Sequence, residues 1–111
     1  MKYINKSLSI EKVKIKDIAK KFGTPIYCYS YKQLKENISN FKKNFKSFSP
    51  LICFAIKSNS NVSLIKEIRK FGLGADVVSK GELMMALKAG INPKKIVFSG
   101  VGKTSNEISY A

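Results

Sequence analysis

Several residue types are rare or missing in this 111-residue chain, and each absence excludes a class of function. The chain contains no histidine, so neither a histidine-ligated metal nor a catalytic triad built on histidine is expected within it. The two cysteines, Cys28 and Cys53, show no metal-ligand spacing, and we expect reduced thiols rather than a disulfide framework. The longest apolar runs reach about six residues, against the ~20 that cross a bilayer, and we expect no signal peptide and no membrane partner.

Acidic residues are also few, 7 against 21 basic ones, which gives a net charge of +14. A charge of this size is typical of proteins that bind nucleic acids. However, Arg69 is the only arginine, and arginine is the residue best suited to bind bases and phosphates through paired hydrogen bonds. The lysines are spread along the chain without a dense block. We therefore interpret them as a solvated surface and expect no nucleic-acid partner.

The N-terminal residues 1–30 predict a helix followed by a strand. Residues 16–22 place apolar side chains on one helical face, and Gly23 with Pro25 ends that helix. Residues 25–29 are rich in aromatic side chains, which favours a short strand. Ser30 and Gln33 then have the spacing of a capping box, which predicts a helix running to Phe45.

Beyond Pro50 the pattern becomes a regular repeat of strand and helix. Strands are predicted at residues 51–56, 75–78 and 96–98, with helices capped by Asn61, by Ser79 with Glu82, and by Thr104 with Glu107. The run 51–56 is apolar without alternation, which is typical of strands in parallel sheets. The repeat predicts an α/β fold, the opening βα units of a (β/α)8 TIM-type barrel that is incomplete in this chain. An open doubly wound sheet is the alternative that spacing leaves open, and either fold implies a longer protein.

Two charged residues stand where parallel α/β folds carry out chemistry. Lys57 directly follows the apolar run, at the carboxyl end of its strand, where partial burial would favour a neutral, nucleophilic amine able to form a Schiff base. Asp76 lies in the next strand, and parallel pairing would bring it near Lys57, where its charge could balance a cation. A surface lysine and a structural aspartate are the alternatives that the residues alone leave open.

Four segments in this order resemble the diaminopimelate decarboxylase family, which belongs to the alanine-racemase-like barrels. They are residues 23–29 (GTPIYCY), 54–61 (FAIKSNSN), 72–83 (GLGADVVSKGEL), and 89–91 with 96–104 (AGI and IVFSGVGKT). The resemblance implies a pyridoxal 5'-phosphate enzyme of lysine biosynthesis that converts meso-2,6-diaminopimelate to L-lysine and CO₂. It also implies that Lys57 holds the cofactor covalently and that Asp76 lies in the cofactor site.

The resemblance further implies how the chain is organised. Residues 1–30 would pack with a C-terminal β domain, and residues 31–111 would form the first part of the cofactor-binding barrel. The whole enzyme would be a cytoplasmic homodimer, and this part, about its first quarter, would be inactive alone. Another decarboxylase of the same fold (ornithine or arginine type), a small basic nucleic-acid-binding module and a non-catalytic remnant are the alternative interpretations.

Overall fold

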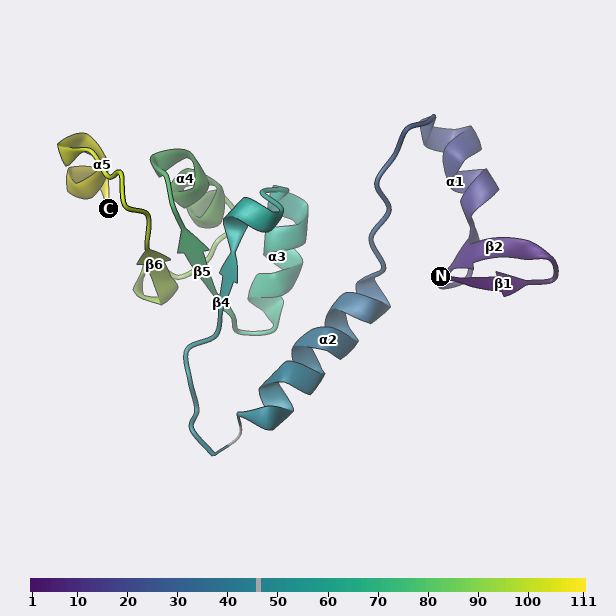
Figure 1. Cartoon of the computed structure of the whole chain (residues 1–111), viewed down its shortest axis with the longest axis horizontal. Helices are drawn as coiled ribbons and strands as arrows, with labels where there is room; N and C mark the ends of the chain where they lie inside the picture. The colour runs from purple at the N-terminus through teal and green to yellow at the C-terminus, as the bar shows by residue number, and fades with distance from the viewer. Residues whose placement is uncertain (46) are drawn as a thin grey trace. The chain divides into compact units, whose positions relative to one another are not determined.

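The computed structural model describes residues 1–45 and 47–111 (Figure 1). The chain divides into two compact units, Met1–Ser47 and Phe48–Ala111. The first unit holds a small antiparallel sheet and two helices, and the second holds a parallel sheet with its helices. The candidate residues for chemistry, Lys57 and Asp76, both belong to the second unit.

Three short strands form the sheet of the first unit: β1 (Lys2–Ile4), β2 (Ser7–Ile10) and β3 (Val13–Lys14), antiparallel and paired in that order. Asn5 and Lys6 join β1 to β2 with φ angles of 47° and 60°, which suit the two-residue turn of a tight hairpin. The sequence patterns predict no sheet here, because strands of 2 to 4 residues are too short to show clear alternation.

Helix α1 (Ile15–Phe22) confirms the helix predicted over residues 16–22. It ends as expected at Gly23, whose φ of 82° lies in the left-handed region that favours glycine. The Gly23 N–H donates to the carbonyl oxygen of Ala19 at 2.8 Å and so satisfies one of the last carbonyls of the helix.

The strand predicted over residues 25–29 is wrong, because residues 23–30 form neither helix nor strand. The side chain of Tyr27 is 90% exposed, so it packs little against the rest of its unit. Aromatic residues favour strands only where a neighbouring strand accepts their backbone hydrogen bonds. Both sheets among the described residues consist of other segments, so this stretch has no such neighbour.

Helix α2 (Tyr31–Asn44) begins after Ser30, whose Oγ accepts the N–H of Gln33 at 3.1 Å. The Gln33 side chain does not return to Ser30, so the predicted capping box is only half formed. Glu11 of the β2–β3 loop takes its place, because its Oε1 accepts the Ser30 hydroxyl at 2.8 Å and the Lys32 N–H at 2.9 Å. Those two donors lower the pKa of Glu11, the backbone N–H having the larger effect.

The second unit confirms the predicted repeat of strand and helix. Its parallel sheet has the order β4 (Cys53–Ala55), β5 (Gly74–Val77), β6 (Ile96–Phe98). Its helices are α3 (Val62–Lys70), α4 (Lys80–Lys88) and α5 (Ser105–Tyr110), with one-turn 3₁₀ helices η1 (Ile56–Ser58) and η2 (Pro93–Lys95). The first strand is shorter than predicted over 51–56, because η1 begins at Ile56.

One face of this sheet carries the core. Ala75 and Val77 of β5 are fully buried there against Ile65 of α3 and Ala86 of α4. The other buried members of this cluster are Ile56, Leu83, Ala89 and Ile91. Each fully buried isoleucine contributes roughly 1.5–3 kcal/mol, so this face supplies much of the stability of the unit.

The opposite face of the sheet carries small or polar residues. Alternation along the paired strands places Cys53, Ala55, Gly74, Asp76 and Val97 on it, and Val97 is 47% exposed. Gly74 is required by a close approach, since a Cβ atom there would lie 2.1 Å from the backbone oxygen of Lys95. Among the described residues the sheet is therefore well covered on one face only, whereas the continuous apolar run 51–56 predicts burial on both.

Candidate functional site at the carboxyl ends of the strands

Lys57 lies in η1, directly after the carboxyl end of β4. Ile56 before it is fully buried in the core and anchors the backbone, while the Lys57 side chain is exposed. The partial burial predicted for Lys57 is thus not provided by the described residues. The same residues give its Nζ no hydrogen bond and no ion pair.

Asp76 lies in β5, directly opposite Ala55 of β4 and Val97 of β6, and is half-buried. Its Oδ1 accepts the hydroxyl of Ser99 at 2.5 Å. Within the described part of the chain no ion pair joins Asp76 to Lys57, although both occupy the same end of neighbouring strands. The arrangement therefore brings the two predicted residues to one edge of the sheet, without a hydrogen bond or an ion pair between them.

Sequence reasoning missed Ser99 as a partner of Asp76. The contact follows from the register of the strands: Val97 pairs with Asp76, and Ser99 comes two residues after Val97, so the side chains of Asp76 and Ser99 fall on the same face. The Ser99 N–H also donates to the carbonyl oxygen of Val77 at 2.9 Å, which continues the pairing of β5 and β6 beyond the strands themselves.

Two other lysines follow strands at this edge, and the amine of each contacts another residue of the chain. The Lys103 Nζ donates to the Gly100 carbonyl oxygen at 2.6 Å and lies 5.4 Å from the centre of the Phe98 ring. The Lys80 Nζ lies 4.5 Å from the centre of the Tyr110 ring, a cation–π contact. Of these three lysines, Lys57 is therefore the one whose amine is not held by another described residue.

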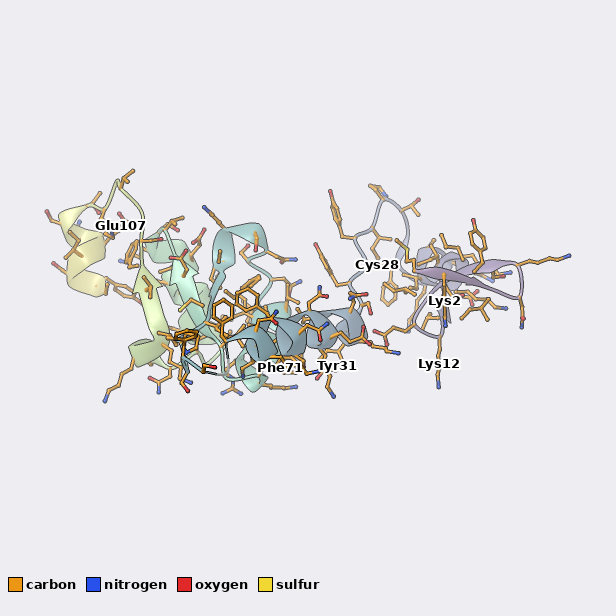
Figure 2. All side chains as sticks on the ribbon, turned by 60° about the horizontal axis from the view of Figure 1, so that its bottom comes forward. Lys2, Lys12, Cys28, Tyr31, Phe71 and Glu107 are labelled. Carbon is orange, nitrogen blue, oxygen red and sulfur yellow. The ribbon has the colours of Figure 1, made fainter. Side chains whose placement is uncertain are left out.

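Glu107 of α5, labelled in Figure 2, holds together the two loops that follow β5 and β6. Its carboxylate accepts the Thr104 N–H at 3.0 Å and the Thr104 hydroxyl at 3.1 Å, which confirms the predicted capping box. It also accepts the N–H of Lys80 at 3.1 Å, at the first turn of α4. The backbone N–H groups of Thr104 and then Lys80 lower the pKa of Glu107.

Glu82 has a capping role, as predicted, but with a different partner. The Ser79 Oγ accepts the Glu82 N–H at 3.2 Å, as a capping box requires. The Glu82 carboxylate, however, accepts the N–H of Val78 at 2.8 Å rather than that of Ser79. This contact fixes the turn between Asp76 and α4.

Both cysteines are free. Burial first, and the charge of Asp76 second, raise the pKa of the Cys53 thiol, so this thiol is protonated and unreactive near neutral pH. The described residues contain no group of three or more side chains that could hold a metal ion. In residues 1–45 and 47–111 no helix is both long enough and apolar enough to cross a membrane.

A family model described as "Pyridoxal-dependent decarboxylase, pyridoxal binding domain" matches residues 31–111. The chain belongs to this family. A curated relative, the diaminopimelate decarboxylase of Aquifex aeolicus, is 46% identical over 111 residues, which is 100% of this chain and 26% of the relative. The predicted cofactor class is thereby confirmed for the family.

Solved structures confirm the predicted α/β fold. The diaminopimelate decarboxylase of M. jannaschi superimposes with a TM-score of 0.92 at 35% identity, over 97% of this chain and 26% of that one. The enzyme of Helicobacter pylori in complex with L-lysine gives 0.81 at 44% identity, over 86% of this chain and 24% of that one. The chain thus spans about a quarter of the length of its relatives, and its fold matches the N-terminal part of theirs.

The residues at the strand ends fit a pyridoxal cofactor. Its aldehyde requires a primary amine that no other group holds, and Lys57 offers one at the carboxyl edge of a parallel sheet. Asp76 of the next strand adds a carboxylate at the same edge of the sheet, where it could balance positive charge.

Proposed function

We propose that this chain forms the N-terminal, cofactor-binding part of a diaminopimelate decarboxylase. The enzyme would remove CO₂ from meso-2,6-diaminopimelate and leave L-lysine, so that one carboxyl group departs and one proton takes its place. The observation that carries the proposal is the free amine of Lys57 at the strand ends of a chain that belongs to this family.

Each residue of the site has a role in this proposal. When bound, pyridoxal phosphate withdraws electrons from the substrate carbon that loses CO₂. Lys57 would hold the cofactor through its Nζ, at the carboxyl edge of the parallel sheet. Asp76, in the next strand, would balance positive charge in the site. Glu82 and Glu107 hold the neighbouring loops in place through hydrogen bonds to backbone N–H groups.

The choice of substrate is supported by the relatives. The Aquifex aeolicus protein that matches the whole chain is a diaminopimelate decarboxylase, and the Helicobacter pylori enzyme was solved with L-lysine, the product that the proposed reaction would form. We extend both properties to this chain as part of the proposal.

The organisation of the whole enzyme is also proposed. Residues 1–30 would pack with a C-terminal β domain and residues 31–111 would begin the barrel, a division that is supported by the start of the family match at residue 31. We further propose a cytoplasmic homodimer without a nucleic-acid partner. The free thiols of Cys28 and Cys53 are compatible with a reducing compartment.

A substrate assay tests the proposed function. The full-length protein containing this sequence is loaded with pyridoxal phosphate, and CO₂ release is measured with meso-diaminopimelate, ornithine and arginine. We expect release with diaminopimelate and its loss in Lys57→Ala, with Lys103→Ala as the matched control that keeps activity. Preference for ornithine or arginine would assign the chain to another branch of the family, and an active Lys57→Ala protein would refute the site.

A further inference from the structure

The hydrogen bond between Ser99 and Asp76 joins the candidate site to a residue that neither the family match nor the sequence motifs assign. The Ser99 Oγ donates to the Asp76 Oδ1 at 2.5 Å. In the part of the chain that the structure describes, the second oxygen, Oδ2, accepts no hydrogen bond. One oxygen of the carboxylate is therefore fixed from β6, while the other stays available to a ligand.

The backbone, and not the hydroxyl, sets the position of Ser99. Its N–H donates to the Val77 carbonyl oxygen at 2.9 Å. The next residue, Gly100, has a φ of 33° and lies so close to Val78, the residue that follows β5, that an added Cβ atom would be 3.0 Å from the Val78 carbonyl oxygen. Ser99 is thus held by its own backbone N–H and by the close packing of the following residue, Gly100. Its side chain is exposed, so it can be changed without moving the loop.

A carboxylate at the end of a strand can rotate about two side-chain bonds, and its charge is useful only if it points in one direction. A hydroxyl donor at a fixed place restricts that rotation. Charge-assisted hydrogen bonds of this kind are short and about twice as strong as neutral ones. The 2.5 Å separation between Ser99 and Asp76 falls in that class.

We propose that Ser99 is a positioning residue that orients the Asp76 carboxylate toward the cofactor held at Lys57. This inference rests on the proposed function, because it requires pyridoxal phosphate in the site. Ser99 acts through Asp76 and need not touch the cofactor. The backbone N–H holds Ser99 in place, and the side-chain hydroxyl carries the positioning role, which separates this role from a structural one.

The test measures the affinity of the full-length apoprotein for pyridoxal phosphate by titration, with thermal unfolding of the same samples as a second readout. We expect Ser99→Ala to weaken binding roughly tenfold or more, the loss typical of one hydrogen bond to a charged group. Ser99→Thr, which keeps the hydroxyl, should stay within about twofold of the original affinity. Ser105→Ala, a nearby exposed serine that makes no hydrogen bond through its side chain in the described chain, serves as the unchanged control.

A double-mutant cycle decides whether Ser99 works through Asp76. In an Asp76→Ala background, Ser99→Ala should cause no further loss of affinity. Equal losses in both backgrounds, or an unchanged affinity in Ser99→Ala, would overturn the inference while leaving the proposed function intact. An original protein that binds no pyridoxal phosphate would overturn both. Equal apoprotein melting temperatures for Ser99→Ala and the original protein are expected, and a large drop would instead indicate a structural role.

Discussion

The two faces of the β4–β5–β6 sheet are made by the same strands but differ in what they bury. Ala75 and Val77 point to α3 and α4 and are fully buried, whereas Asp76 between them points to the opposite face and is half-buried. The difference follows from the two-residue period of a strand, which sends neighbours to opposite sides. The covered face stabilises the unit, and the open face carries the polar residues that chemistry needs.

The largest expected effect comes from leaving the open face without a cover. A polypeptide of these 111 residues alone should self-associate, because the sheet exposes apolar side chains such as Val97, which is 47% exposed. Size-exclusion chromatography with light scattering measures this. Val97→Lys should reduce the association, whereas Met84→Lys on α4, at a side chain that is 51% exposed, should not. A monodisperse monomer with a sharp melting transition would contradict the expectation that the open face of the sheet needs a cover.

On the covered face, Ile65→Ala should lower the free energy of unfolding by about 2–5 kcal/mol, because it leaves a cavity among fully buried side chains. Lys66→Ala on the exposed side of the same helix is the control and should change stability little. Denaturant unfolding of the full-length apoprotein provides the measurement. At temperatures where Ile65→Ala remains folded, its affinity for pyridoxal phosphate should be preserved; a large loss would mean that the two faces are not separable.

A smaller, pH-dependent effect is expected from Glu107, which joins the loops that follow β5 and β6. Its pKa is lowered from the ordinary value of 4.5 in the folded chain, so it stabilises the folded state above that pH. This contribution should disappear as the pH falls through the lowered folded-state pKa. Melting temperatures of the original protein and Glu107→Gln should therefore converge in acid and differ near neutrality. If the melting temperatures of the two proteins instead differed by the same amount at every pH, the Glu107 carboxylate would not stabilise the folded state in this way.

Much of the second unit can be predicted from sequence because its signals are local. The caps at Asn61, Ser79 and Thr104 each hold a hydrogen bond in the structure, and each precedes the helix expected there. The continuous apolar run after Pro50 correctly predicts a parallel strand, although the strand is shorter than the run.

What sequence could not predict depends on partners distant along the chain. The strand expected at residues 25–29 has no neighbouring strand among the residues that the structure describes, and the Glu11 contact to the start of α2 spans 21 positions. The Ser99–Asp76 hydrogen bond spans 23 positions and becomes visible only once the register of β5 and β6 is known. The exposure of Lys57 likewise depends on what covers the open face, which the adjacent apolar residues do not reveal.

Locating the cofactor on the full-length protein tests directly whether Lys57 is the residue that holds it. Borohydride reduction of the protein loaded with pyridoxal phosphate, followed by peptide mapping, identifies the lysine that carries it. We expect the label on Lys57 alone, and its loss in Lys57→Arg, because a guanidinium stays charged and cannot react with the aldehyde. Lys80→Ala and Lys103→Ala should keep the label, since both amines are engaged elsewhere. Label on another lysine would contradict the assignment of Lys57 and the functional account built on it.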